Sequence, residues 1–209
     1  MTAAELLDGT RIVPVVVIDD PDAAVPLART LLGAGLGAIE VTLRTPDAPA
    51  AIRNIASEVP EILIGAGSLR TPRQVEDVCG AGATFGVSPG SSPRLLDAVE
   101  AADLTFVPGA ITPSESLALL DRGYDLQKLF PASIAGGVAY LKALGSPLPE
   151  VKFMPTGGIN PDNAADYLAL GNVACIGGSW VAPRNLLADG DFDAIRNIAV
   201  AAASLAHGD

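Results

Sequence analysis

Short runs of β-branched and aliphatic residues recur along the chain at intervals of roughly twenty to twenty-six residues, the spacing of one strand–helix unit. The runs predict eight strands, at Ile12–Ile18, Ala38–Leu43, Ile62–Ala66, Thr84–Val87, Leu104–Val107, Leu126–Phe130, Val151–Met154 and Val173–Ile176. The segments between them repeat apolar residues with the period of an amphipathic helix, as Pro21–Leu32 does with Ala24, Leu27 and Leu31. Threonine followed by proline predicts two further helix starts, at Thr71-Pro72 and Thr112-Pro113.

Eight alternating units without a Pro/Gly-rich linker predict an α/β fold, a single (β/α)8 TIM barrel that forms one domain over residues 1–209. Ala3–Leu7 is expected to add an extra N-terminal helix that closes the lower end of the barrel. An open doubly wound sheet is the alternative that eight similar units do not exclude. In the barrel, polar residues at the carboxyl ends of the strands are expected to form the site.

The second predicted strand carries a carboxylate on its inner face. Alternation turns three apolar residues toward the helices, namely Ile39, Val41 and Leu43. It leaves Glu40 and Thr42 inside the barrel and Arg44 at its mouth. A buried carboxylate is costly without a partner or a task, so Glu40 is expected to be either a general base or half of an ion pair with Arg44 or Lys128.

Lys128 lies in the sixth predicted strand and is one of only three lysines, with Lys142 and Lys152. Alternation places it inside the barrel with Leu126 and Phe130. A buried lysine tends to lose its proton, and the neutral amine is a nucleophile toward ketones, which predicts Schiff-base chemistry. The alternatives are a lysine that reaches solvent or one that only pairs with Glu40. Lys142 and Lys152 are expected to be surface charges.

Glycine-rich turns follow the last two predicted strands, at Pro155-Thr156-Gly157-Gly158-Ile159 and Gly177-Gly178-Ser179-Trp180. Glycines let backbone N–H groups approach an anion closely, and the loops after strands 7 and 8 are the usual phosphate site of such barrels. Tight turns without a ligand are the simpler alternative. Trp180 is expected to pack rather than to stack on a substrate.

Composition narrows the function classes. With 13 basic and 24 acidic residues, the net charge of −11 argues against a general nucleic-acid binder. The same negative charge means that an anionic substrate needs a local cluster of hydrogen-bond donors or cations.

Cys79 and Cys175 lack metal-ligand spacing and are expected to be buried free thiols in a reducing compartment. The chain shows neither a signal-peptide pattern nor an apolar run of membrane-spanning length, which predicts a cytoplasmic protein that does not bind membranes. His207, the single histidine, is not expected to be catalytic, and no cluster suggests a metal.

These motifs together resemble the bacterial 2-keto-3-deoxy-6-phosphogluconate (KDPG) aldolases, which also act as 4-hydroxy-2-oxoglutarate (KHG) aldolases. The resemblance runs from Arg11 to Asn185. Its specific parts are Gly35-Leu36, Glu40-Val41-Thr42-Leu43-Arg44, Gly65-Ala66-Gly67, Ser88-Pro89-Gly90, Pro108-Gly109, Lys128-Leu129-Phe130-Pro131-Ala132, Pro155-Thr156-Gly157-Gly158-Ile159 and Gly177-Gly178-Ser179-Trp180.

The resemblance implies a class I aldolase that needs no metal or cofactor, usually a homotrimer, in the Entner–Doudoroff pathway. It implies that Lys128 forms the Schiff base and that Glu40 is the general acid and base. It assigns the substrate's carboxylate to Arg44 and Thr156 and further substrate contacts to Ser68, Pro89 and Phe130. It assigns the phosphate end to Gly157, Gly158, Gly177, Gly178 and Ser179.

Two positions depart from the family pattern. Ser68 stands where the family usually has threonine, and Gln127 occupies a usually apolar position on the strand face opposite Lys128, where it needs a hydrogen-bond partner. A galactonate-type aldolase fits less well, because Thr42, Arg44 and Thr156 are present. Two other functions stay open, a phosphosugar isomerase or epimerase on the same barrel and a non-catalytic sensor of sugar acids.

Overall fold

Strands and helices alternate along the chain as the hydrophobic pattern predicts. The computed structural model describes the backbone of residues 1–207 and the side chains of residues 1–205. The described strands are β1 (Ile12–Val16), β2 (Ala38–Thr42), β3 (Leu63–Gly67), β4 (Phe85–Val87), β5 (Phe106–Val107), β6 (Leu126–Leu129), β7 (Lys152–Pro155) and β8 (Ile176–Gly178). The described helices are α1 (Ala3–Leu6), η1 (Pro21–Ala23), α2 (Ala24–Gly33), α3 (Ala48–Glu58), α4 (Pro72–Ala81), α5 (Pro93–Ala101), α6 (Pro113–Leu120), α7 (Gly137–Leu144), α8 (Ala164–Leu168), α9 (Arg184–Ala188) and α10 (Phe192–His207).

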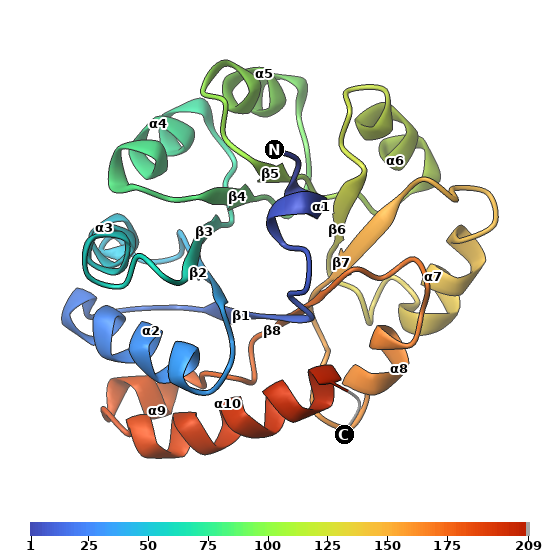
Figure 1. Cartoon of the computed structure of the whole chain (residues 1–209). Helices are drawn as coiled ribbons and strands as arrows, with labels where there is room; N and C mark the ends of the chain where they lie inside the picture. The colour runs from blue at the N-terminus through green and yellow to red at the C-terminus, as the bar shows by residue number, and fades with distance from the viewer. Residues whose placement is uncertain (208–209) are drawn as a thin grey trace.

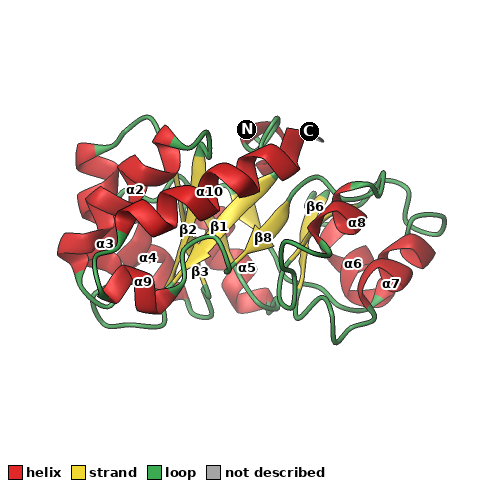
Figure 2. Cartoon of the chain, turned by 90° about the horizontal axis from the view of Figure 1, so that it is seen from below, coloured by secondary structure: helices red, strands yellow, loops and turns green. Residues whose placement is uncertain are grey.

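The described strands pair in two parallel sheets. Within the described chain, six strands pair in the order β5-β4-β3-β2-β1-β8, a parallel half-barrel, and β6 pairs with β7. Two isolated parallel bridges, Gly109↔Lys128 and Thr156↔Gly177, connect the β6–β7 pair to the segment after β5 and to β8. Helices α2 to α10 lie outside the strands, whereas α1 lies inward of them (Figure 1). Figure 2 shows α10 crossing the layer of strands, and this helix contacts α2, α8 and α9.

Buried apolar side chains form two clusters, one on each side of the strands. The outer cluster includes Ile39 and Val41 of β2 together with Leu27 and Leu31 of α2. Each fully buried leucine contributes about 1.5–3 kcal/mol to stability. The inner cluster includes Ala38, Phe85, Val87, Val107, Leu126, Met154 and Cys175. Ala38 belongs to the inner cluster, whereas Ile39 and Val41 belong to the outer one. This difference confirms the alternation of faces predicted for the second strand.

The first residues form a short helix that packs on the inner cluster. Thr2 caps α1 through a capping box with Glu5, which satisfies two backbone donors at the helix start. Ala3 and Leu7 are buried and belong to the inner cluster. The chain therefore begins against the side chains that the strands turn inward, as α1 in Figure 1 shows.

The local signals for helices are largely confirmed. Thr71 and Thr112 accept the backbone N–H groups of Gln74 and Glu115, so both threonine–proline pairs start helices. Lys142 lies exposed on α7, and Lys152 lies exposed at the first position of β7. The predicted helix over residues 21–32 is divided, because a 3-10 turn at Pro21–Ala23 precedes α2.

Two predictions were wrong. The last strand is Ile176–Gly178 rather than Val173–Ile176, since Gly177 and Gly178 pair with Val13 and Pro14 while Val173 forms an isolated bridge. Cys79 is exposed, although Cys175 is buried as expected. The reason is helical geometry: α4 buries Val75, Val78 and Ala81, and the residue after Val78 points away from that face.

Two further predictions concern membrane-spanning helices and His207 near the end of the chain. Among the described residues, we find no helix with the length and apolar character that crossing a membrane requires. The backbone of His207 ends α10, but its side chain lies outside the described residues.

Candidate active site

The candidate site is built around one ion pair on the inner side of the strands. Lys128 of β6 and Glu40 of β2 are 88 positions apart in sequence, yet Lys128 Nζ donates to Glu40 Oε1 at 2.9 Å and to Oε2 at 3.1 Å. Their side chains are only 6% and 1% exposed. The predicted ion pair between Glu40 and Lys128 is therefore present. It places a carboxylate that can act as a base next to the lysine amine.

Gly67 leaves the space that the Glu40 carboxylate occupies. In the register of β2 and β3, Glu40 lies beside Gly65 and Thr42 beside Gly67. A Cβ atom at position 67 would overlap Glu40 Oε1 and would come within 2.7 Å of its Cγ. The sequence pattern did not predict this role of Gly67, and the signal that could have indicated it is a glycine on a strand next to a buried acid.

Besides the Glu40 carboxylate, Lys128 has apolar neighbours. The Phe130 ring centroid lies 5.8 Å from Nζ, and Met154 is the neighbour of Lys128 in the β6–β7 register. Cys175, also in the inner cluster, is fully buried, and burial raises the pKa of its thiol to about 12, so it remains protonated near neutral pH. Electrostatic interactions are stronger where water is excluded, which favours a tight Glu40–Lys128 contact.

Thr156 supplies a buried hydroxyl group without a partner. It directly follows β7 and is 5% exposed, and its Oγ1 has no hydrogen-bond partner among the described residues. A Cβ atom at Gly177 would overlap this oxygen, so the glycine makes room for it. Leaving a buried hydroxyl unsatisfied costs about 1–3 kcal/mol, so a ligand atom that bonds Thr156 Oγ1 recovers that energy.

The turn after β7 is folded against the turn after β6. Gly157 and Gly158 have φ angles of 97° and 77°, which side chains rarely adopt. A Cβ atom at Gly157 would lie 3.3 Å from the Phe130 ring, and one at Gly158 would overlap Ser133 Oγ. Without side chains, the backbone of this turn can approach an anion closely.

Ser179 lies exposed directly after β8. The half-buried Trp180 packs its ring against Gly178 and on the outer cluster, so it acts as a packing residue, as predicted. The serine hydroxyl is therefore held at the carboxyl end of β8, the strand whose Gly177 bridges to Thr156.

Three more predicted residues lie after the neighbouring strands β2, β3 and β4. Arg44 is exposed, and its Nε donates to Ser68 Oγ at 3.4 Å, so Arg44 bonds to Ser68, whereas Glu40 pairs with Lys128. Ser68 has a φ of 62°, which is uncommon for a residue other than glycine. Pro89 is exposed after β4, and its backbone lies where a Cβ atom at Gly109 would be.

Gln127 has hydrogen-bond partners on the helix side of β6. Its Nε2 donates to the carbonyl oxygens of Ser116 and Tyr124, at 3.0 Å each. Its Oε1 has no partner in the described part of the chain. This polar residue therefore joins β6 to α6 and lies on the face opposite Lys128.

Across residues 1–207, no three His, Cys, Asp or Glu side chains come together in an arrangement that could hold a metal ion. What the residues do bring together are a buried amine, a carboxylate, an unpartnered hydroxyl and glycine turns. This combination suits covalent chemistry on a ketone that carries anionic groups.

Comparison with known proteins supports the same chemistry. Residues 4–198 match the family described as KDPG and KHG aldolase. The 2-dehydro-3-deoxy-phosphogluconate aldolase of Pseudoalteromonas atlantica is 46% identical over 208 residues, covering 100% of this chain and 97% of that protein. The KHG/KDPG aldolase of Escherichia coli K12 is 45% identical over 198 residues, covering 95% and 93%.

A solved structure provides a match at the level of the fold. The KDPG aldolase of Legionella pneumophila, with pyruvate captured at low pH as a covalent carbinolamine intermediate, superposes with a TM-score of 0.93 at 41% identity. The match covers 96% of this chain and 98% of that one. On its sequence and its fold, the chain belongs to the KDPG and KHG aldolase family.

Proposed function

We propose that this protein is a class I aldolase that cleaves KDPG to pyruvate and glyceraldehyde 3-phosphate, KHG to pyruvate and glyoxylate, or both. The observation that carries the proposal is the buried contact of 2.9 Å between Lys128 Nζ and Glu40 Oε1. An amine needs a neighbouring base to become a neutral nucleophile, and Glu40 is that base.

The cycle begins with a proton transfer within the pair. The proton moves from Lys128 Nζ to Glu40, and the neutral amine attacks the C2 ketone of the substrate. The proton of the new ammonium group moves to the C2 oxygen to give the carbinolamine, and the proton held by Glu40 then leaves with the C2 hydroxyl as water, which gives an iminium ion and restores the Glu40 carboxylate. The iminium is the electron sink that the next step requires.

Cleavage follows at the C3–C4 bond. Glu40, directly or through water, removes the proton of the C4 hydroxyl, and the C3–C4 bonding electrons move toward the iminium nitrogen. The aldehyde leaves, and pyruvate stays bound to Lys128 as an enamine. Protonation at C3 by Glu40 and addition of water at C2 then release pyruvate and regenerate the lysine.

The remaining site residues bind the two ends of the substrate. Arg44 and Thr156 hold the carboxylate, the first by charge and the second through its unpartnered hydroxyl. Ser68, Pro89 and Phe130 complete the pyruvate end. The phosphate end is held by Ser179, by Gly157 and Gly158 of the turn after β7, and by Gly177 and Gly178 at the end of β8.

The same proposal extends to architecture. The bridges Gly109↔Lys128 and Thr156↔Gly177 support a closed (β/α)8 barrel in which α1 covers the amino ends of the strands. We further propose a single domain over residues 1–209 that assembles as a homotrimer in the cytoplasm and acts in the Entner–Doudoroff pathway. Size-exclusion chromatography with light scattering tests the trimer.

Borohydride trapping tests the proposed function. Incubation with pyruvate and sodium borohydride should add one reduced pyruvate to the chain, detected by mass spectrometry. Lys128→Met should abolish both the adduct and pyruvate release in an assay coupled to lactate dehydrogenase, whereas Lys142→Met, a change at an exposed lysine, should affect neither. A folded wild-type protein that forms no adduct and releases no pyruvate would point to an isomerase-like, non-covalent role of the site.

A further inference from the structure

Asp19 and Arg184 join the loops that follow two neighbouring strands. Asp19 comes after β1 and Arg184 begins α9 after β8, and β1 and β8 pair through Pro14↔Gly178. Arg184 Nε donates to Asp19 Oδ2 at 2.7 Å, and Arg184 Nη2 donates to Oδ1 at 2.6 Å. A two-pronged contact of this kind restricts orientation as well as distance, which a single contact does not.

The β8 loop that ends at Arg184 contains Ser179. The ring of Trp180 packs on Gly178, and Val181 and Ala182 are buried in the outer cluster. The Asp19–Arg184 contact fastens the far end of this loop. Ser179 is therefore held between the end of β8 and the packed segment that follows it, and the ion pair fastens the far end of that segment.

The loop that carries Asp19 is also tied to the opposite end of the proposed substrate site. Thr45 Oγ1 donates to the carbonyl oxygen of Ile18 at 2.6 Å. Thr45 directly follows Arg44, whose Nε donates to Ser68 Oγ. Side-chain contacts thus connect the loops after β8, β1, β2 and β3 in the order in which those strands lie in the sheet.

We propose that Asp19 and Arg184 are positioning residues that set the place of the Ser179 loop relative to Arg44, and thereby favour the phosphorylated substrate. This inference rests on the phosphate end proposed above. Among the described residues, Asp19 and Arg184 bond to each other, whereas Lys128 Nζ bonds to Glu40. Its effect should therefore appear in the KM of a substrate long enough to reach both ends.

A purely electrostatic role of the Arg184 charge predicts a different change in substrate binding, which makes the inference testable. If Arg184 acted only through its charge, Asp19→Asn would leave a free cation near the phosphate and would strengthen binding. If the pair positions the loop, Asp19→Asn releases the loop and weakens binding. The double variant Asp19→Asn with Arg184→Gln keeps the local net charge but removes the pair.

The experiment measures kcat and KM for KDPG and KHG side by side in the full-length protein. Both Asp19→Asn and the double variant should lower the ratio of kcat/KM for KDPG over KHG by about three- to fivefold, mainly through KM for KDPG, the range that an exposed ion pair supports. The inference is overturned if this ratio rises in Asp19→Asn or stays constant in the double variant. It is also overturned if kcat/KM falls equally for both substrates. If the wild-type protein releases pyruvate from neither substrate, the proposed function fails instead.

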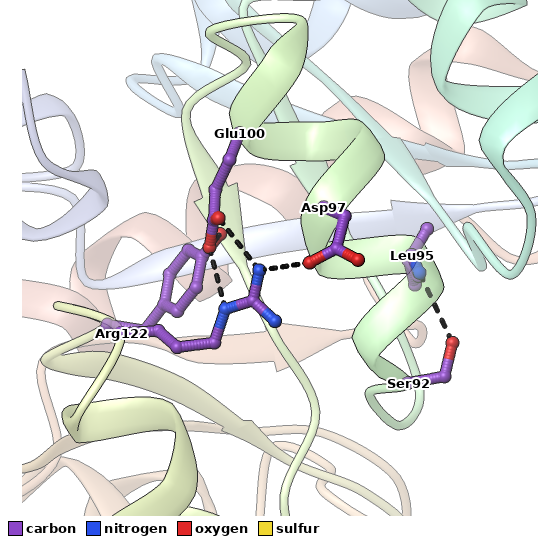
Figure 3. A network of polar contacts seen from close by, with 6 residues as sticks. Ser92, Leu95, Asp97, Glu100 and Arg122 are labelled. Atoms are coloured by element: carbon purple, nitrogen blue, oxygen red, sulfur yellow. Dashed lines mark hydrogen bonds and ion pairs between the residues drawn. The ribbon is translucent and has the colours of Figure 1, made fainter.

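Arg122 offers a matched control. It precedes β6, at the amino ends of the strands, and its guanidinium donates to Glu100 and Asp97 of α5 at 2.6–2.9 Å (Figure 3). Arg122→Gln removes an ion-pair network of similar geometry away from the proposed site. It should leave the KDPG to KHG ratio constant even if the melting temperature falls, so a change of the ratio here would show that general loosening explains the effect.

Discussion

Lys128 Nζ lies 2.9 Å from Glu40 Oε1 although the two residues come from β6 and β2, which belong to different sheets. Both are buried, so neither charge is balanced by water. Removing one partner of a buried ion pair leaves an uncompensated charge and is usually strongly destabilising. Glu40 therefore has two roles, because it balances the charge of Lys128 in the folded protein and is also the residue proposed to take the Lys128 proton.

Glu40→Gln should separate these two roles. The amide keeps the shape of the side chain but cannot accept a proton, so kcat for pyruvate release should fall by about 10²- to 10⁴-fold. The assay couples pyruvate to lactate dehydrogenase, and Glu76→Gln, a change of an exposed acid on α4, serves as the control. A kcat within tenfold of the wild-type value would remove Glu40 from the proton-transfer steps.

Gly67→Ala should displace the Glu40 carboxylate. The new Cβ atom would overlap Glu40 Oε1, so either the side chain or the strand must move. We expect a loss of about 1–3 kcal/mol of unfolding free energy and at least about a tenfold loss of kcat, measured by denaturant titration and the pyruvate assay.

Gly80→Ala is the matched control for this change. Position 80 lies in α4 with open space around its Cα, so alanine should stabilise the protein by about 0.5–1 kcal/mol. Equal behaviour of the two variants would contradict the close packing of Gly67 on Glu40.

Thr156→Val should change stability and binding in opposite directions. Valine keeps the side-chain shape and removes a buried hydroxyl that has no partner in the described chain, so the unliganded protein should be at least as stable, by about 0–1 kcal/mol. The KM for KDPG should rise by about tenfold, since the substrate loses a hydrogen bond. A destabilised variant with unchanged KM would assign the hydroxyl a structural role.

Glu115 should make part of the stability dependent on acid pH. Backbone N–H groups of Ile111 and Thr112 donate to its carboxylate and hold its pKa below the ordinary value of 4.5. Because the folded pKa is depressed, this stabilisation is present above pH 4.5 and is lost as the pH falls through the folded value.

The matching variant is Glu115→Gln, which does not titrate. Its melting temperature should be lower than that of the wild-type protein by about 2 °C near pH 7, with the difference narrowing toward pH 3. Thermal unfolding followed by circular dichroism across this pH range measures both proteins. A difference that stays constant or widens on acidification would contradict the role of the Glu115 charge.

The two cysteines should differ in reactivity toward a thiol reagent such as DTNB. Cys79 is exposed and should react in the native protein, at a moderate rate because partial burial raises the pKa of its thiol. Cys175 is buried with a thiol pKa of about 12 and should react only after unfolding. One thiol per chain is therefore expected in buffer and two in denaturant, and the Cys79→Ser variant should show none in buffer.

Local patterns in the sequence were sufficient to predict the alternation of strands and helices. The two-residue period of β2 separates Glu40 from Ile39 and Val41 over a few residues, and the cap at Thr112 needs only the next three residues. The same short-range patterns identified Lys128 and Glu40 as residues that the strands turn inward. Helical spacing also contained the information that Cys79 lies outside the buried face of α4.

Only the tertiary structure revealed which of these residues meet. The Glu40–Lys128 contact, the space at Gly67 and the Asp19–Arg184 pair each join segments that are distant in the chain or on different strands. The partners of Gln127 likewise depend on how α6 packs on β6. Sequence periodicity specifies the face on which a side chain lies, whereas strand order, register and the packing of loops decide its neighbours, and these follow from the energetics of the whole fold.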